Sequence, residues 1–217
     1  MSDNRPGKTA RVTARKRRSD GERSRTAILH TAAQLATVEG INGLSISRLA
    51  NAVGMSKSGL FAHFGSKEEL QLATVEFASA VFSAEVTGPA AEAADGMPRL
   101  RSLVENFLHH VERGVFPGGC FFASTTAELD TQSGPVRDRV LEVENDFLAR
   151  IDAAARQAQA DGDIASSEDV EQLIFELHAF LLLANALFVL TQDSAPMERA
   201  RRAIDRRLAV APTPARP

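Results

Sequence analysis

The stretch Leu44–Leu70, LSISRLANAVGMSKSGLFAHFGSKEEL, decides the fold of this chain. A helix-turn-helix needs a small residue where its second helix crosses the first, and Ala50 supplies one. Four positions later, Gly54 supplies the residue that tolerates a positive φ in the turn. The apolar positions expected to be buried around this turn are Leu49, Val53, Met55 and Leu60. The spacing therefore predicts a helix-turn-helix.

Serines begin three successive helices in this stretch. Ser45 and Ser56 precede the two helices of the helix-turn-helix, and a serine suits an N-cap because its hydroxyl accepts a backbone N–H. Ser66 and Glu69 have the spacing of a capping box, which predicts a longer helix after it. In a helix-turn-helix the N-terminal end of the second helix enters the major groove of DNA, and here Ser56 begins that helix. The residues expected to project there are Lys57, Ser58 and Gly59.

Outward from this stretch the chain stays helical, with apolar residues recurring every three or four positions. Further helices are expected at residues 98–113, 120–131, 135–160, 167–192 and 196–208, with a break at 88–98. In the absence of a strand pattern, we predict an all-α fold, a three-helix helix-turn-helix domain followed by a larger helical bundle. The expected divisions are a disordered basic arm at 1–21, the helix-turn-helix domain at 22–67, the bundle at 68–210 and a frayed tail at 211–217.

Charge is distributed unevenly along the chain. Residues 1–67 contain 12 Lys and Arg with 4 Asp and Glu, whereas the remaining 150 residues contain 13 and 24. A basic N-terminal third on an acidic body indicates a polyanion-binding module attached to a second unit. The most apolar run, Leu173–Leu190, is interrupted by Glu176, His178 and Asn185, so we expect a buried core helix and no membrane partner. A cytoplasmic protein is expected.

Residues Ser24 to Phe77 resemble the DNA-binding domain of the TetR family of bacterial transcriptional regulators. The resemblance rests on the helix-turn-helix spacing together with the motif FAHFGSKEEL at Phe61–Leu70. It implies that residues 68–210 bind a small effector and dimerise. One position departs from the family pattern, since Phe61 stands where the family commonly has tyrosine. A phenolic hydroxyl toward phosphate is therefore missing, and we expect Phe61 to pack against the protein.

The resemblance also implies DNA-contacting roles for individual residues. Arg48 lies on the positioning helix, where family members reach a phosphate or a base edge. His63 and Lys67 lie where the family grips phosphates, and a helix N-terminus at Lys67 favours anions. Ser45 and Ser56 offer hydroxyls as well as caps. The expected DNA-binding set is Ser45, Arg48, Ser56, Lys57, Ser58, Gly59, His63 and Lys67.

The expected partners are a double-stranded DNA operator, a small hydrophobic effector and a second copy of the chain. The helices near 167–192 and 196–208 are expected to form the homodimer interface, because the first is apolar on nearly every face. Apolar walls with a few polar groups are typical of small-molecule sites. The residues expected to line the effector site are Phe107, His110, Phe116, Cys120, Phe121, Phe147, Phe175 and His178.

Cys120 is the single cysteine, which excludes an intrachain disulfide and a cysteine-based zinc site. It follows Gly118 and Gly119, and a helix beginning there would lower the thiol pKa and make an oxidation or electrophile sensor. The alternative is a small buried thiol that packs as a hydrophobic residue.

We expect an effector-responsive transcriptional regulator, a repressor released from a palindromic operator by its ligand, with activation as an alternative polarity. A second interpretation is a helix-turn-helix DNA binder without an effector. A third is a helical enzyme that uses Cys120. The sequence contains no G-x-S-x-G, H-E-x-x-H, Walker A or G-x-G-x-x-G motif, so no catalytic residue, cofactor or metal is expected.

Overall fold

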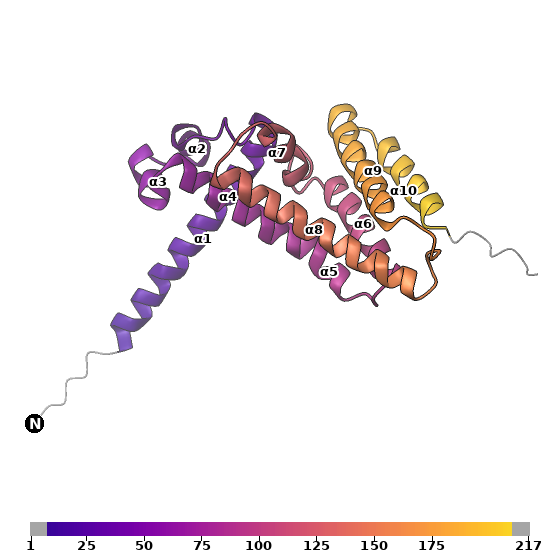
Figure 1. The fold of residues 1–217 in the computed structure, drawn as a ribbon. Helices are drawn as coiled ribbons and strands as arrows, with labels where there is room; N and C mark the ends of the chain where they lie inside the picture. The colour runs from indigo at the N-terminus through magenta and orange to yellow at the C-terminus, as the bar shows by residue number, and fades with distance from the viewer. Residues whose placement is uncertain (1–7, 210–217) are drawn as a thin grey trace, which may run out of the picture.

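A computed structural model describes residues 8–209 of the chain. All regular elements within this range are helical, which confirms the predicted fold class. Figure 1 shows the helix-turn-helix at one end of an elongated helical body. The elements are α1 (Lys8–Glu39), α2 (Ile46–Val53), α3 (Lys57–Phe64), α4 (Lys67–Phe82), the π-helical η1 (Ser83–Thr87), α5 (Gly88–Ala91), α6 (Met97–Glu112), α7 (Phe121–Leu129), α8 (Pro135–Ala160), α9 (Val170–Thr191) and α10 (Ala195–Arg207).

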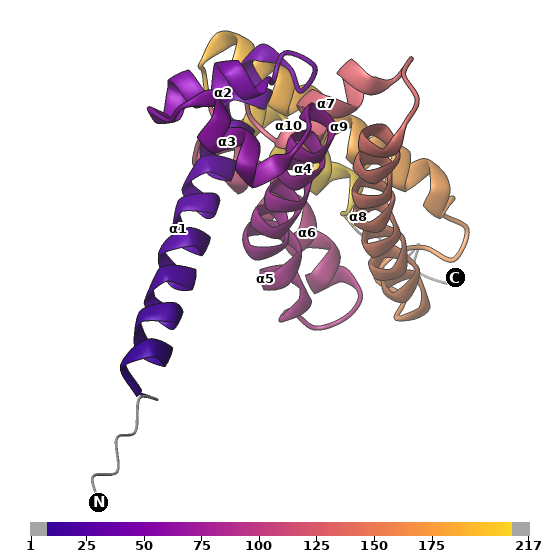
Figure 2. The ribbon, with the colours of Figure 1, turned by 90° about the vertical axis from the view of Figure 1, so that its left-hand side faces the viewer.

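The first helix corrects the expectation of a disordered arm. α1 begins at Lys8 and extends away from the body, as Figure 1 and Figure 2 show. Residues 8–20 contain neither glycine nor proline and are rich in arginine, lysine and alanine, which have high helix propensity. The expected disorder is therefore wrong for residues 8–21. Residues 1–7 and the expected tail at 211–217 lie outside the described residues.

Local capping chemistry places the helix starts where the sequence predicts them. The hydroxyls of Ser45, Ser56 and Ser66 accept N–H groups three residues later, at 3.2, 3.1 and 3.0 Å. Gly54 ends α2 with φ 67°, the left-handed conformation that the turn requires. The capping box is half formed, because the N–H of Ser66 donates to the Phe64 carbonyl at 2.8 Å.

The expected break at 88–98 begins later than predicted. Helical structure continues from α4 through η1 and α5 to Ala91. Pro89 has no N–H for the carbonyl four residues earlier, and a proline in a helix interior is accommodated by widening the turn. The π-helical turn accordingly lies just before it, where the Gly88 N–H bonds the Ser83 carbonyl.

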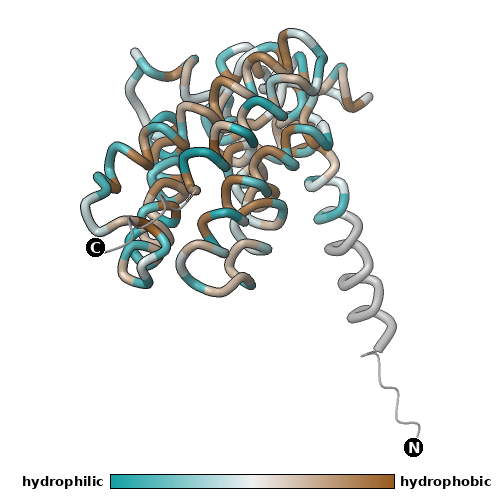
Figure 3. The backbone as a smooth tube through the Cα atoms, turned by 90° about the vertical axis from the view of Figure 1, so that its right-hand side faces the viewer, coloured by the Kyte–Doolittle hydropathy of each residue, from teal (hydrophilic) through white to brown (hydrophobic). Residues whose placement is uncertain are grey.

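Two hydrophobic cores meet along α4. The small core packs α1, α2, α3 and the start of α4, and the large core joins the rest of α4 to α5–α10. Phe77 packs against both cores, so the two units share one helix. The small core comprises Ile28, Leu29, Ala32, Leu44, Leu49, Ala50, Leu60, Phe64 and Leu70. Figure 3 shows hydrophobic and hydrophilic residues alternating along the helices of the body, as amphipathic packing requires.

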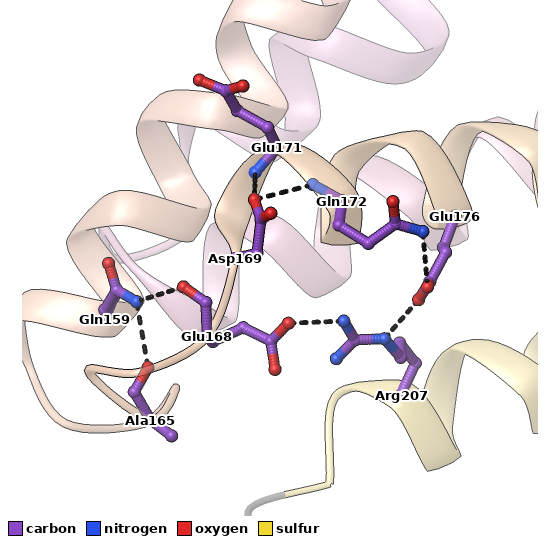
Figure 4. A network of polar contacts seen from close by, with 8 residues as sticks. All are labelled: Gln159, Ala165, Glu168, Asp169, Glu171, Gln172, Glu176 and Arg207. Carbon is purple, nitrogen blue, oxygen red and sulfur yellow. Dashed lines mark hydrogen bonds and ion pairs between the residues drawn. The ribbon is translucent and has the colours of Figure 1, made fainter.

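Polar contacts fix the C-terminal helix against the bundle. The Arg207 guanidinium on α10 pairs with Glu168 at 2.6 Å and with Glu176 on α9 (Figure 4). Asp169 caps α9 by accepting the N–H of Glu171 and of Gln172 at 3.0 and 3.1 Å. α9 is long and apolar enough to cross a membrane by length and composition, but it packs here against α10, α8 and α6.

Candidate nucleic-acid interface and effector core

The second helix of the helix-turn-helix, α3, presents its predicted base-reading residues outward. Leu60 and Phe64 are buried in the small core and fix the helix from beneath. Lys57 and Ser58 are exposed in the first turn of the helix, and the Ser58 hydroxyl lies 3.3 Å from that of Ser56. The first turn of α3 is therefore free to meet another surface.

Phe61 corrects the expectation that it packs against the protein. Its side chain is 54% exposed on α3. Phe61 lies four positions after Lys57 and three after Ser58, so its side chain neighbours both of them on the helix surface. The outward surface of α3 thus combines one cation, one hydroxyl and one aromatic ring.

Arg48, on α2, is already paired in this structure. Its Nε lies 2.9 and 3.1 Å from the two carboxylate oxygens of Glu39, the last residue of α1. The hydrogen bond and the opposite charge lower the pKa of Glu39 and raise the pKa of Arg48. Arg48 therefore forms a two-pronged contact of the kind that a phosphate also accepts.

Lys67 also makes an internal contact. Its Nζ donates to the Asn42 carbonyl at 2.6 Å, and Gln71, one turn further along α4, donates to the Ile41 carbonyl at 2.7 Å. Both side chains hold the turn between α1 and α2. Lys67, which is predicted to bind phosphate, therefore also stabilises the turn that precedes the helix-turn-helix.

Glu128 on α7 holds the same turn from the other side. Its carboxylate oxygens accept the N–H of Ile41 at 2.7 Å and of Asn42 at 2.8 Å. Gly40 has φ 82°, and a Cβ there would lie 2.9 Å from each of these oxygens. Sequence reasoning missed this contact, because no local pattern joins residues 86 positions apart.

Arg25 is a second residue that sequence reasoning missed. Its guanidinium lies 4.6 Å from the centre of the Phe64 ring and donates to the His63 carbonyl at 2.8 Å. Arg25 thereby joins α1 to the end of α3. The half-buried His63 ring lies beside Phe64, with the ring centres 6.1 Å apart.

Most of the predicted effector residues gather in one aromatic cluster. Phe82, at the end of α4 and absent from the sequence prediction, lies at its centre. Ring centres near Phe82 are 5.2 Å away for Phe147, 5.7 Å for Phe122 and 5.9 Å for His110. The cluster, defined as Phe82, Phe107, His110, Phe116, Phe121, Phe122 and Phe147, is buried in the large core.

His110 is the polar member of the aromatic cluster. Its side chain is 2% exposed, and within the described residues its Nδ1 has no hydrogen-bond partner. Burial lowers the pKa of His110 to about 4, so the ring is neutral at pH 7. The cluster therefore contains one unpaired polar atom among phenyl rings.

Cys120 is a buried thiol, not an acidic one. It stands at the N-cap of α7 with 1% of its surface exposed, and burial raises its pKa to about 12. Desolvation of the thiolate outweighs the field of the helix N-terminus, so the thiol pKa is not lowered and the alternative interpretation, a small buried thiol, is confirmed. Its backbone N–H donates to the Asn185 side chain on α9 at 2.8 Å.

Besides Cys120, two predicted effector residues lie outside the cluster. Phe175 is 69% exposed on α9. His178 makes a contact of 2.6 Å with Glu144 on α8, which binds its Nε2 at the boundary of the two helices. Periodicity places both residues on α9 but does not say which face of that helix the bundle covers.

α9 and α10 leave an apolar surface uncovered. Phe175, Leu183 and Leu190 on α9 are 69%, 60% and 78% exposed. A groove of about 270 Å³ runs between the two helices. It is lined by Phe180, Leu183, Ala184, Leu187, Pro196, Arg199, Ala200 and Ala203.

Comparison with known proteins supports this architecture. The TetR transcriptional regulator from Chloroflexus aurantiacus has a TM-score of 0.78 and 26% identity over 86% of this chain and 94% of its own. AibR, solved in complex with isovaleryl coenzyme A and operator DNA, shares the fold with a TM-score of 0.68 and 24% identity, over 84% of this chain and 97% of AibR.

One group of curated relatives carries the name nucleoid occlusion factor SlmA. The protein from Vibrio vulnificus is 29% identical over 123 residues, which are 57% of this chain and 59% of SlmA. The protein from Vibrio atlanticus is 30% identical over 134 residues, which are 61% of this chain and 65% of SlmA. The chain thus matches about three-fifths of the length of these relatives.

Family models cover both units of the chain. Residues 28–74 match the model of the bacterial regulatory proteins of the tetR family, and residues 96–204 match the tetracyclin repressor-like C-terminal domain. The first match includes the helix-turn-helix, and the second spans half of the chain. The chain therefore belongs to the TetR family of bacterial transcriptional regulators.

Proposed function

We propose that this regulator is a cytoplasmic, homodimeric repressor that leaves a palindromic operator when a small hydrophobic ligand binds. The observation that carries the proposal is the exposed surface of α3, where Lys57, Ser58 and Phe61 lie together. The helix itself is held in place by its buried residues Leu60 and Phe64. A short exposed helix held rigidly in this way suits the major groove.

Within this proposal, base reading and phosphate binding fall to different residues. Lys57 and Ser58 contact base edges, and the close approach of the Gly59 backbone is permitted by its missing side chain. Phosphates are held by the residues around them, Ser45, Arg48, Ser56, His63 and Lys67. Ser45 uses its oxygen as a cap, which leaves its hydroxyl hydrogen for a phosphate. The Ser56 hydroxyl also caps a helix and lies 3.3 Å from that of Ser58, a contact that a phosphate oxygen replaces.

The basic first helix adds to this interface. Residues 8–25 contain eight lysines and arginines on a helix that projects from the helix-turn-helix end of the body. Cations in such an extension attract the phosphate backbone without reading sequence. We therefore assign α1 before residue 26 to phosphate contacts that flank the operator.

Dimerisation is supported by the uncovered apolar surface of α9 and α10. Large apolar side chains exposed in a row on one helix mark an interface between proteins. A two-fold pair of these helices forms a four-helix interface and places two copies of α3 on one palindrome.

The aromatic cluster supports an apolar effector whose polar group bonds the unpaired Nδ1 of His110. AibR, which shares this fold, was solved with an acyl coenzyme A and operator DNA. α4 joins both cores, so a change in the aromatic cluster can move α3. The ligand releases the DNA because it binds more tightly to a conformation in which the two copies of α3 do not match the spacing of the operator half-sites.

A DNA binder without a small-molecule effector is the second candidate. The close ring contacts of the aromatic cluster favour it. The third interpretation, an enzyme using Cys120, is disfavoured by the burial and raised pKa of that thiol. Activation in place of repression depends on the position of the operator in a promoter.

The test begins with selection of duplexes from a random-sequence pool by the purified protein. A palindromic consensus bound tightly at two salt concentrations supports the proposal, and loss of that binding in a screen of hydrophobic acids and acyl thioesters separates it from the second candidate. Lys57→Ala is expected to relax base preference, whereas Lys67→Ala lowers affinity for all sequences. Binding governed by salt alone, with no consensus, overturns the proposal.

A further inference from the structure

We propose that Glu128 is a positioning residue for DNA binding, a latch through which α7 sets the orientation of the helix-turn-helix. The latch consists of the Glu128 carboxylate and the N–H groups of Ile41 and Asn42. The inference rests on the proposed function. It adds a second mechanical connection between the helical bundle and the helix-turn-helix, besides α4.

The latch holds a turn from which the DNA-binding helices start. Residues 40–45 connect α1 to α2, so the backbone of Ile41 and Asn42 sets where α2 begins. Both carboxylate oxygens are engaged at 2.7 and 2.8 Å, and hydrogen bonds to a charged acceptor are the stronger ones. The same two residues accept bonds at their carbonyls from Gln71 and Lys67 on α4. The turn is therefore clamped between α7 and α4.

The other end of α7 is fixed to α9 and α1. The N–H of Cys120 donates to the Asn185 side chain of α9 at 2.8 Å, and the N–H of Gly118 donates to the Thr37 hydroxyl at 3.2 Å. The backbone at Gly118 and that of Thr37 are so close that a Cβ on Gly118 would lie 2.0 Å from the Thr37 carbonyl oxygen. α7 thus spans from the helix with the uncovered apolar face to the turn before α2.

This arrangement predicts a route for coupling that avoids α4. A shift of α9 at the dimer interface moves the start of α7 through Asn185, and Glu128 carries the shift to the α1–α2 turn. A variant that separates positioning from charge tests this route. Glu128 offers such a separation, because its carboxylate is negative and lies beside a surface proposed to bind a polyanion.

The decisive variant is Glu128→Gln, which keeps the shape of the side chain but places an NH2 group against a backbone N–H. The matched control is Asp130→Asn, which removes the same charge at the end of α7. The exposed Asp130 side chain has no hydrogen bond or ion pair within residues 21–209. Electrostatics alone predicts that both variants bind DNA slightly more tightly.

If Glu128 positions the helix-turn-helix, Glu128→Gln is expected to bind DNA more weakly, the opposite result. Its affinity for the duplex selected by the wild-type protein is expected to fall about tenfold, while Asp130→Asn equals or exceeds the wild type. Hydrogen exchange of the Ile41 and Asn42 amides is expected to accelerate roughly 10- to 100-fold in Glu128→Gln, as for loss of a charged hydrogen bond. The amide of Ile151, in the core of α8, is expected to exchange at the wild-type rate.

Each alternative outcome is distinguishable. Equal gains in affinity for the two variants overturn the positioning role, as does fast exchange at Ile41 and Asn42 with unchanged affinity. Accelerated exchange at Ile151 as well shows general destabilisation and also overturns it. A wild-type protein that selects no consensus overturns the proposed function, whereas a consensus bound equally by Glu128→Gln overturns the latch alone.

Discussion

Arg48 on the positioning helix α2 is held by Glu39, the last residue of α1, through both oxygens of the carboxylate. A phosphate group presents the same paired acceptors, so binding of DNA through Arg48 requires that the Glu39 contact be exchanged. The two acceptors therefore compete for one guanidinium.

Glu39→Gln is expected to strengthen DNA binding because it weakens this competition. The pKa of Glu39 is lowered by the Arg48 hydrogen bond, so the carboxylate stays charged throughout the neutral range and the competition does not vary with pH there. We expect affinity to rise by about two- to tenfold, measured by fluorescence anisotropy, with the largest gain at low salt. Glu68→Gln, an exposed carboxylate on α4, is the charge-matched control, and an equal gain in both variants would contradict specific competition.

Phe61 tests whether the exposed ring of α3 contributes to recognition. Phe61→Ala is expected to weaken operator binding roughly tenfold, since an apolar contact with thymine methyl groups or sugars is lost. Phe61→Tyr adds a hydroxyl that reaches a phosphate, and we expect it to bind at least as tightly with the same salt slope. Since the 54% exposed side chain supports little of the core, thermal stability should change little in either variant. Unaltered affinity in Phe61→Ala would remove the ring from the interface.

His110 predicts a pH dependence of stability. Its pKa is lowered by burial from 6.5 to about 4, so the unfolded chain binds the proton more tightly than the folded chain. Stability from this group is complete above pH 6.5 and decreases as the pH falls toward 4, by about 1.4 kcal/mol per unit at most. Denaturant titrations between pH 4 and 7.5 measure this slope.

His110→Phe is the control for that slope. The variant replaces the imidazole ring by a phenyl ring and removes the unpaired Nδ1, which costs little or is favourable. The stability of this variant should not show the decrease between pH 6.5 and 4 that His110 contributes in the wild type. A slope equal to that of the wild type would show that other groups cause the acid sensitivity.

Leu183 tests the dimer interface. The side chain is 60% exposed on α9 and lines the groove toward α10, so Leu183→Glu places a charge in the centre of the proposed four-helix contact. We expect sedimentation to show a monomer and circular dichroism to show an unchanged helical content. Operator binding should weaken at least tenfold. Val38→Glu, 64% exposed on α1, is the control that should stay dimeric. A dimeric Leu183→Glu would place the interface elsewhere.

The sequence alone determined the local structure of the helix-turn-helix. Ser45, Ser56 and Ser66 begin helices because their hydroxyls bond N–H groups three residues away, and Gly54 turns the chain because it lacks a Cβ. These interactions lie within a few residues, so spacing encodes them. The basic character of the N-terminal third likewise follows from composition.

Only the tertiary structure decided which side chains meet and which are buried. Glu128 lies 86 positions from Asn42, and no periodicity brings them together. The helix that carries Phe175 is evident from the sequence, but packing leaves that ring exposed while it encloses Phe82. At Cys120 the helix N-terminus suggested an acidic thiol, and burial decided the opposite. The cost of removing charge from water depends on every neighbour in space, which the order of residues along the chain does not specify.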